Sequence, residues 1–419
     1  MSVGMKKGKA AARSKERAIW IFAGGPMQEV AARKVLERGY KLLVTDRNPA
    51  CVCAAHADEV VALDTFDIKG NLKAAPRLGR KYRIEAVLAP AADCHETVAF
   101  VGKALGLPAI SPEVSRRCRY KNVTREVLSQ AGIPQPGFRS VRTANEARDF
   151  LREIGGRGVV KATDNSGSRG FTAVREPEDL TEEAFERAVS AGTTGLAVVE
   201  EMLFPVENEI AEQSVETLWH NGRMYWLNWV DRLFRKDFLL FESLKTGIYE
   251  SVSWGVEIGH INPALHPYGI KAAVADLVHQ AGLAVGMHKE KGGHIFKADI
   301  MLTRKGPFIL EVTPRLSGGW DSSGSTPARG ADFAGGAVAM ALGERLTLPA
   351  WHRYFQYRDP ERFVSVLARI EEGAMDCIGR RFSIGSAYDR EDALRNTLAN
   401  LLEGRYVVPV VQQETTGHA

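Results

Sequence analysis

The chain has 419 residues, of which 45% are hydrophobic and 25% charged, as expected of a globular protein with roughly two to four domains. Its 55 basic and 51 acidic residues give a net charge of +4, which argues against a protein that binds nucleic acid or a membrane surface. No segment reaches the roughly 18 uninterrupted apolar residues of a membrane span.

The first 17 residues hold much of the positive charge, because six basic residues face only Glu16. They lack the apolar run of a secretory signal and predict a disordered basic tail, with a transit peptide as the alternative. The five cysteines are an odd number without the spacing of a metal finger. Reduced thiols fit this pattern best, so we predict a cytoplasmic protein.

Alternating strands and helices open the folded part of the chain. We predict strands at residues 18–23, 41–45, 59–63 and 86–89, and helices at residues 28–38 and 96–105. This order predicts an N-terminal α/β domain over residues 18–112 with four parallel strands. The turn Gly24-Gly25-Pro26 lacks the G-x-G-x-x-G spacing of a dinucleotide site, so that cofactor is disfavoured.

A lysine and a glycine-serine loop characterise the next segment, residues 113–198. A single helix over residues 114–131 carries Lys121, and a strand at residues 158–161 ends in Lys161, just before the loop at residues 164–170. An ammonium group can hold phosphate oxygens while backbone N–H groups and hydroxyls of such a loop close over them. The loop is not a Walker A motif, and a hairpin turn with a solvent-facing lysine is the alternative.

Acidic residues stand at the end of a strand and in a hairpin. A buried strand at residues 196–203 contains Glu200 and Glu201, and a strand that opens at Glu212 turns at Asn221-Gly222 and returns to residue 230. Residues 231–265 are predicted to be irregular, either covering a substrate or forming a surface loop. A helix follows at residues 268–285.

A second predicted hairpin carries two carboxylates, Asp299 and Glu311, on strands at residues 295–302 and 307–312. A hard divalent cation prefers oxygen ligands and keeps room for phosphate oxygens, which suits two carboxylates on neighbouring strands. Thr313 adds a hydroxyl, and Arg315 a cation for an anionic group. Two partly exposed strand carboxylates without a metal are the alternative.

The last part of the chain shows no chemistry of its own. A glycine-rich tract leads to a helix at residues 337–342. Residues 346–419 are predicted to form an appended unit, with strands at residues 363–370 and 406–411 and a helix at residues 390–402. Candidate substrate-lining residues are Asp231, Arg232, Trp254, His294 and Trp320.

Over residues 18–345 the chain resembles the ATP-grasp superfamily, in particular its carboxylate-amine ligases. The resemblance rests on the order of Lys121, Lys161, the glycine-serine loop, Glu200-Glu201, Glu212, Asp299 and the run Glu-Val-Thr-Pro-Arg at residues 311–315. It implies an α/β N-terminal parallel sheet, followed by an α+β ATP-grasp domain with subdomains at residues 113–198 and 199–345. Residues 346–419 would be a small C-terminal appendage.

The resemblance also implies a role for each matching residue. ATP would be bound by Lys121, Lys161, Ser166, Gly167, Ser168, Gly170, Glu200, Glu201, Leu203 and Glu212. In this set the lysines contact phosphates, Glu200, Glu201 and Leu203 form the adenine hinge, and Glu212 accepts the ribose hydroxyls, with Glu207 as its competitor. Mg²⁺, or Mn²⁺ as the alternative ion, would be bound by Asp299, Glu311 and Thr313. Arg315 and Lys161 would be catalytic.

The implied function is ATP-dependent ligation. A carboxylate oxygen attacks the γ-phosphate of ATP, and an amine then attacks the acyl phosphate to give an amide or peptide bond, ADP and phosphate. The expected partners are ATP and small-molecule carboxylate and amine substrates, with no nucleic acid and no membrane, and a homodimer is compatible with the composition. The alternatives are an ATP-grasp carboxylase that uses bicarbonate and an ATP-binding protein without turnover.

Overall fold

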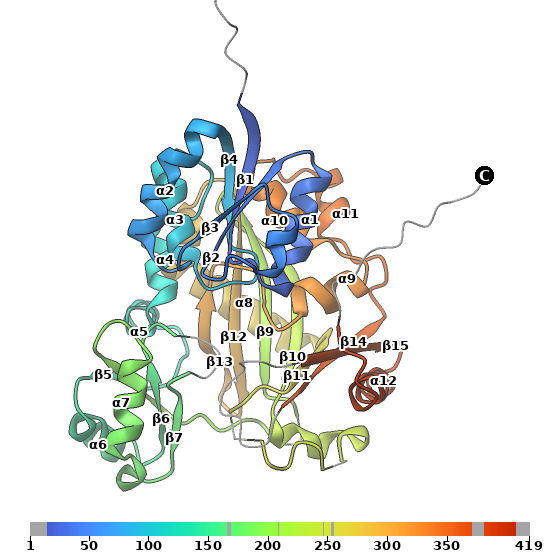
Figure 1. Ribbon diagram of the computed structural model, residues 1–419. Helices are drawn as coiled ribbons and strands as arrows, with labels where there is room; N and C mark the ends of the chain where they lie inside the picture. Colours follow the sequence, from blue (N-terminus) through green and yellow to red (C-terminus); the bar gives the residue numbers. More distant parts are fainter. Residues whose placement is uncertain are drawn as a thin grey trace, which may run out of the picture.

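The computed structural model describes residues 15–165, 169–207, 209–245, 247–252, 255–370 and 381–407. Outside these ranges lie most of the predicted basic tail, Ser166, Gly167 and Ser168 of the glycine-serine loop, Trp254, and the end of the strand predicted at residues 406–411. Figure 1 shows the N-terminal sheet at the top, a large sheet in the centre and a small sheet at the lower left.

The N-terminal sheet has four parallel strands in the order β3-β2-β1-β4. These strands are β1 (Glu16–Phe22), β2 (Lys41–Asp46), β3 (Glu59–Ala62) and β4 (Tyr82–Leu88). Helices cover both faces, which explains the continuous apolar runs at residues 18–22 of β1 and 42–44 of β2. One face packs against α1 (Glu29–Glu37) and α10 (Phe333–Ala341), the other against α2 (Ile68–Lys81) and α3 (His95–Leu105). The predicted parallel unit is confirmed.

Helix α2 was not predicted, because Gly70, Pro76 and Gly79 interrupt its sequence. The carboxylate of Asp67 caps its first turn by accepting a hydrogen bond from the Gly70 N–H at 2.9 Å. Buried Ala74, Ala75 and Leu78 pack on the sheet. Tertiary packing therefore overrides a weak intrinsic helix propensity here.

The single helix predicted over residues 114–131 is wrong, since two helices occupy this segment. They are α4 (Pro112–Arg119) and α5 (Lys121–Gln130), separated by Tyr120, which has extended backbone angles (φ −95°, ψ 110°). The break places Lys121 at the start of α5, where its N–H donates to the Thr163 carbonyl at 2.6 Å. This contact to a distant segment starts the second helix, and no local sequence pattern reveals it.

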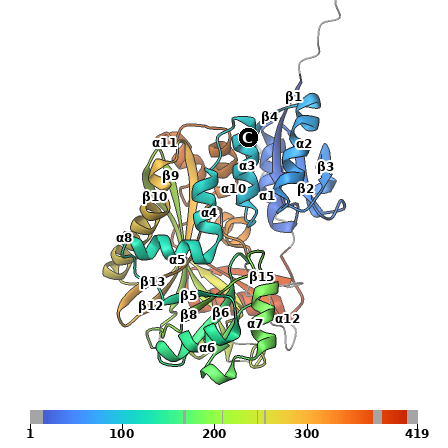
Figure 2. The ribbon, with the colours of Figure 1, turned by 90° about the vertical axis from the view of Figure 1, so that its left-hand side faces the viewer.

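The small sheet is antiparallel, with the order β5-β8-β6-β7. Its strands are β5 (Phe138–Val141), β6 (Gly158–Ala162), β7 (Thr172–Val174) and β8 (Ala197–Glu201). Helices α6 (Ala144–Glu153) and α7 (Glu182–Ser190) pack on it and share one apolar core with it. Figure 2 shows this unit below α5, on the opposite side from the N-terminal sheet.

The large sheet has seven antiparallel strands in the order β13-β12-β9-β10-β11-β14-β15. Its first strands are β9 (Glu212–His220), β10 (Arg223–Leu233), β11 (Gly259–Asn262), β12 (Gly293–Thr303) and β13 (Gly306–Thr313). Both predicted hairpins, β9–β10 and β12–β13, are confirmed. Helix α8 (Tyr268–Val285) packs on one face of this sheet.

The segment predicted to be irregular, residues 231–265, is partly strand. β10 continues to Leu233, and β11 pairs with both β10 and β14. β11 was missed because its four residues, Gly-His-Ile-Asn, are too short to show a strand period and depend on their neighbours for pairing. Between the two strands run the short 3₁₀ helices η4 (Arg235–Leu240) and η5 (Glu242–Leu244).

The C-terminal appendage attaches to the large sheet through β14 (Phe363–Arg369) and β15 (Arg381–Ala387). Its helix α12 (Arg390–Leu402) has the predicted bounds and packs on these strands. The remaining elements are η1 (Pro26–Gln28), η2 (Val52–Ala55), η3 (Pro177–Asp179), η6 (Met287–Lys289), the π-helical turn η7 (Asp321–Ser325), α9 (Thr326–Ala328) and α11 (Leu348–Tyr354). None of the helices in the described ranges has the length and apolarity needed to cross a membrane.

Candidate active site

Asp299 on β12 and Glu311 on β13 stand opposite each other in the large sheet. Directly opposed residues of antiparallel strands point to the same face, with Cβ atoms about 5 Å apart. Both residues line a cavity of 260 Å³. Asp299 is buried, whereas the side chain of Glu311 is 40% exposed. The hairpin thus brings two carboxylates into one cavity, one fixed and one accessible.

Two cations hold Asp299 in its charged form. Lys297 Nζ lies 2.5 Å from Oδ1, and Arg232 Nη1 lies 3.2 Å from Oδ2. Burial alone would raise the pKa of Asp299, but Arg232 and Lys297 lower it to about 2. Asp299 is therefore ionised throughout the neutral pH range, as a metal ligand must be. Arg232, which was among the candidate lining residues, does line this cavity.

Lys121 connects the start of α5 to the carboxylate of Glu311. Its Nζ lies 3.0 Å from Glu311 Oε1 and donates to the Asn165 carbonyl at 2.6 Å. Asn165 immediately precedes the part of the glycine-serine loop that lies outside the described residues. Gly170, at the far end of that loop, has φ +71°, and a Cβ there would lie 2.8 Å from Ala191 Cβ. One lysine therefore contacts both the loop and the predicted metal strand.

Lys161 has a different partner, the buried carboxylate of Glu200. Its Nζ lies 2.7 Å from Glu200 Oε2, while Arg125 Nε lies 2.8 Å from Oε1. Burial raises the pKa of Glu200, but Arg125 and Lys161 together lower it to about 2. Arg125 also donates to the carbonyls of Ile309 and Leu310 on β13 at 2.9 and 2.7 Å. This arginine joins the two sheets, and the sequence reasoning missed it, because nothing in α5 distinguishes it from a surface residue.

The predicted adenine hinge has its backbone partly engaged within the small sheet. The Glu201 N–H donates to the Gly137 carbonyl at 2.7 Å, and the Met202 N–H to the Arg157 carbonyl at 3.3 Å. Leu203 follows the end of β8 and is half-buried. The side chain of Glu200 belongs to the charged cluster described above, and Glu200 pairs with Phe138 of β5 and Val159 of β6 within the sheet.

Of the two predicted ribose acids, Glu212 is the more enclosed. It opens β9 on the same strand face as Ser214, which is the register partner of Asp299, and its Oε1 lies 3.5 Å from Lys236 Nζ. Glu207 is 74% exposed and pairs with Arg304. The location of Glu212 beside the cavity strand favours it over Glu207.

Arg315 reaches from the end of the hairpin to the N-terminal domain. Its Nε donates to Asp93 Oδ1 at 2.7 Å, from the loop after β4. Burial disfavours the charge on Arg315, yet Asp93 and the nearby Glu311 and Asp299 raise its pKa overall. Thr313 is 7% exposed, and its Oγ1 has no hydrogen-bond partner among the described residues. A buried hydroxyl without a partner indicates a place where a ligand oxygen or ion would complete its bonding.

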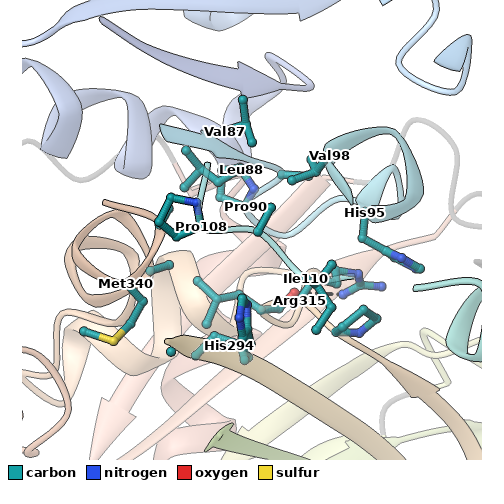
Figure 3. A pocket seen from close by; sticks show the side chains of 18 residues that line it. Val87, Leu88, Pro90, His95, Val98, Pro108, Ile110, His294, Arg315 and Met340 are labelled. Atoms are coloured by element: carbon teal, nitrogen blue, oxygen red, sulfur yellow. Dashed lines mark hydrogen bonds between the residues drawn. The ribbon is translucent and has the colours of Figure 1, made fainter. Parts of the chain in front are cut away.

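Arg315 also borders a smaller cavity, of 90 Å³, between the N-terminal domain and the start of β12. Figure 3 shows its mainly apolar wall, in which His95, His294 and Arg315 are the polar side chains. Burial lowers the pKa of His95 to about 3, and its Nδ1 lies 2.6 Å from Ser115 Oγ. A mainly apolar cavity of 90 Å³ is small for a triphosphate, so the 260 Å³ cavity is the better candidate for the chemistry.

A buried carboxylate pair, which the sequence reasoning did not single out, supports the loop after Arg315. Glu216 Oε1 accepts a hydrogen bond from the Ser317 N–H at 2.7 Å, and Asn228 bridges Glu216 and Asp321. Burial and the charge of Asp321 raise the pKa of Glu216 to about 7. Asn262 also donates to Asp321 at 3.1 Å. Glu216 lies on β9, in the predicted strand that opens at Glu212, but only the fold places Asp321 beside it.

The donor set fits a hard cation that shares its coordination with phosphate oxygens. Within the described ranges no group of three or more His, Cys, Asp or Glu side chains is close enough to hold a metal ion. Asp299 and Glu311 provide two carboxylates, and the unpartnered Thr313 hydroxyl lies on the same strand as Glu311. Magnesium is commonly bound by one or two carboxylates together with substrate phosphates and water, so this smaller set suffices.

The chain was compared with protein-family models and with curated proteins. No protein-family model matches the chain. An uncharacterised protein of Sinorhizobium fredii, y4rH, is 26% identical over 300 residues, which are 70% of this chain and 56% of that protein. The chain therefore spans little more than half the length of this curated relative.

Solved structures are similar over most of the chain. The L-amino acid ligase of Bacillus licheniformis superimposes with a TM-score of 0.66 at 20% identity, covering 86% of this chain and 82% of that one. The biotin carboxylase domain of a Hydrogenobacter thermophilus 2-oxoglutarate carboxylase, a dimer in complex with MgADP, ADP and bicarbonate, gives 0.63 at 18% identity, covering 85% and 75%. Both are ATP-grasp ligases, and an N-terminal parallel sheet followed by antiparallel sheets matches neighbours of this kind over most of the chain. The chain thus has the ATP-grasp fold that its sequence predicted.

Proposed function

We propose that this chain is an ATP-dependent ligase that joins a small-molecule carboxylate to an amine through an acyl phosphate. The observation that supports this most directly is the 260 Å³ cavity that Asp299, Glu311 and Arg315 line together, with Lys121 paired to Glu311. Opposed carboxylates beside fixed cations suit a magnesium-bound triphosphate and an anionic acceptor.

In this proposal each residue holds one part of the reaction. Asp299 and Glu311, with Thr313, would hold Mg²⁺, which neutralises charge on the phosphates when bound. Lys121 and Lys161 would contact phosphate oxygens, and residues 166–170 would exclude water. Glu200, Glu201 and Leu203 would flank the adenine, and Glu212 the ribose.

Arg315 would orient the substrate carboxylate. That carboxylate attacks the γ-phosphorus, and the bond from the γ-phosphorus to the β–γ bridging oxygen breaks to release ADP. The amine then attacks the carbonyl carbon of the acyl phosphate, loses a proton, and phosphate leaves. Asp93 acts by positioning, because it holds the Arg315 guanidinium at the cavity wall. No side chain forms a covalent bond in either step.

Release of ADP and phosphate, measured over pools of carboxylates and amines, tests the proposal. The expected result is ADP formation that depends on both an acid and an amine. Glu311→Gln should reduce turnover by roughly 100-fold or more, because an amide replaces a charged metal ligand. Glu126→Gln, an exposed change on α5, is the matched control and should leave turnover unchanged.

A second candidate is a carboxylase that uses bicarbonate as its acid, since the similar carboxylase domain was crystallised with bicarbonate. The same cavity could activate bicarbonate, and ADP formation that depends on bicarbonate would select this reaction. Nucleotide binding with no ADP release under any condition, or full activity of Glu311→Gln, would contradict both candidates.

A further inference from the structure

A second large cavity, of 380 Å³, lies between α1 of the N-terminal domain and the segment that follows the active-site loop. It shares no lining residue with the 260 Å³ cavity. Figure 1 shows α1 and α10 side by side in this part of the molecule, with α11 next to them. Its volume lies within the range of small-molecule pockets, about 300–1,000 Å³.

Basic side chains outnumber acidic ones in this cavity. The charged lining residues are Arg33, Lys34, Arg353 and Arg358 against Glu37 and Asp332. Both acids are occupied by one lysine, because Lys34 Nζ lies 3.1 Å from Glu37 and 3.5 Å from Asp332. Asp332 in addition caps α10 through the Gly335 N–H at 2.9 Å. The three arginines therefore have no carboxylate partner among the residues that line the cavity.

The arginines differ in how they are held. Arg33 pairs with Glu29 outside the cavity at 2.7 Å, yet its buried Nε has no acceptor among the described residues. Arg353 and Arg358 are exposed, and neither forms an ion pair with a carboxylate in the described part of the chain. Gly330, with φ +84°, allows the Arg358 side chain to lie against its backbone, since a Cβ there would be 2.7 Å from Arg358 Cβ. Arg353 lies over the Tyr354 ring at 5.2 Å, so two guanidinium groups without a carboxylate partner among the described residues stand at one cavity.

A buried hydroxyl supplies an independent indication of a ligand. Ser323 lines this cavity, is 3% exposed, and its Oγ has no hydrogen-bond partner among the residues described. Its neighbour Ser322 is satisfied, because it donates to the Ser317 carbonyl at 2.6 Å. A buried polar group without a partner is costly, so a bound molecule or water is expected at Ser323.

The wall that carries Ser323 is shared with the candidate active site. Ser323 belongs to the π-helical turn η7, whose first residue, Asp321, lines the 260 Å³ cavity. Asp321 is tied to Asn228 and Asn262 in the buried network beneath the active-site loop. A molecule bound to Ser323 would therefore touch the turn that supports the substrate side of the site. Short π-helical turns frequently occur at functional sites.

We propose that this second cavity binds a small molecule with two negative charges, carried by carboxylate or phosphate groups, separately from ATP and the substrates. Arg353 and Arg358 contact its charged groups, and Ser323 provides a buried hydrogen bond. Guanidinium groups suit this task because each presents a planar pair of donors to a carboxylate or phosphate. Binding of this molecule affects the active site through η7, which lines both cavities.

Titration calorimetry of the full chain with sodium succinate and with sodium phosphate tests the site, with sodium acetate as the singly charged probe. Ionic strength is matched with sodium chloride, and the measurement is repeated with a saturating non-hydrolysable ATP analogue. We expect saturable binding of succinate or phosphate, in both conditions, and at least about tenfold weaker binding of acetate. If succinate binds more tightly, the site prefers carboxylate groups; if phosphate binds more tightly, it prefers a phosphate group.

Arg358→Glu and Arg353→Glu should each weaken binding at least about tenfold, and Ser323→Ala about threefold, whereas Arg80→Glu on α2 should leave it unchanged. If Arg358→Glu lowers the melting temperature, Arg358→Met replaces it, because methionine removes the positive charge without introducing a negative one. The proposal is overturned if neither dianion binds, if the ATP analogue abolishes binding, or if the arginine variants bind normally. Sedimentation in which Arg358→Glu dissociates a dimer while anion binding persists would assign this surface to a second copy instead.

Discussion

Two lysine–glutamate pairs lie around the candidate active site, and they differ in almost every physical respect. Lys161 pairs with Glu200, which is 1% exposed and is also held by Arg125. Lys121 pairs with Glu311, which is 40% exposed and borders the 260 Å³ cavity. A buried charge must keep a partner, whereas an exposed pair is worth little and can be exchanged for a ligand.

The comparison separates structural from chemical roles. Arg125 reaches Glu200 on the small sheet and the β13 carbonyls on the large sheet, so this cluster connects the two sheets. Because Arg125 remains with Glu200, under the proposed function Lys161 could turn toward a phosphate without leaving a carboxylate unpaired. Glu311 forms an ion pair with no second cation among the described residues, so under the proposed function its charge would be available to a metal ion once Lys121 turns to the phosphates.

The largest expected effect comes from breaking the buried cluster. Glu200→Gln leaves Arg125 and Lys161 without their carboxylate, so the free energy of unfolding should fall by about 3–5 kcal/mol in urea titrations at pH 7. Glu153→Gln, which breaks the exposed pair with Arg139 in the same small sheet, should cost less than about 1 kcal/mol. Equal losses in the two variants would show that Glu200 is not a structural anchor.

The same cluster predicts an acid limit. The folded-state pKa of Glu200, about 2, lies below its ordinary value of 4.5. Its contribution to stability is therefore complete above pH 4.5 and is lost as the pH falls toward 2, by about 3 kcal/mol in all. Between pH 5 and pH 3, Glu200→Gln should lose less of its own stability than the unmodified chain. If urea titrations showed the same loss of stability between pH 5 and pH 3 in Glu200→Gln and in the unmodified chain, this prediction would be contradicted.

Much of this geometry could be predicted from the sequence, because hairpins depend on local patterns. The Asn221-Gly222 turn predicted the first hairpin, and two β-rich runs around the polar turn at residues 303–306 predicted the second, with Asp299 and Glu311 on neighbouring strands. The parallel sheet followed from its alternating strands and helices. These features need only short stretches of chain to be recognised.

The features that were missed depend on contacts between distant segments. The break at Tyr120 accompanies a hydrogen bond from Lys121 to Thr163, and the role of Arg125 depends on β8 and β13. Likewise, Glu216 becomes unusual only because the fold brings Asp321 to it. No spacing within the sequence predicts such meetings, since each partner is unremarkable in its own segment.

Glu216 titrates in the opposite direction to Glu200, and its expected effect on stability is smaller. Burial and Asp321 raise its pKa from 4.5 to about 7, so its favourable contribution is present below pH 4.5 and is lost as the pH rises through 7. Glu216→Gln should remove this loss, since the amide oxygen can still accept from the Ser317 N–H. We expect the variant to be more stable than the unmodified chain by about 1–3 kcal/mol at pH 8, with little difference at pH 5.

Glu183→Gln, an exposed change on α7, is the control for this titration and should shift stability equally little at both pH values. Urea titrations at pH 5 and pH 8 provide the measurement. A Glu216→Gln variant that is less stable at pH 8 than at pH 5, relative to the unmodified chain, would mean that Glu216 is charged in the folded state.

The smallest expected change in stability, and the sharpest contrast with Glu200, concerns Lys121. Lys121→Met removes a part-buried pair whose carboxylate is 40% exposed, so the free energy of unfolding should change by only about 1 kcal/mol. Under the proposed function the same variant loses a phosphate contact, and the ATP-induced rise in melting temperature should shrink or disappear. Lys103→Met, an exposed change on α3, should keep the full rise. Two results together would contradict this contrast: a loss of stability in Lys121→Met as large as in Glu200→Gln, and an undiminished rise in melting temperature with ATP. Lys121 would then be a structural residue and not a phosphate ligand.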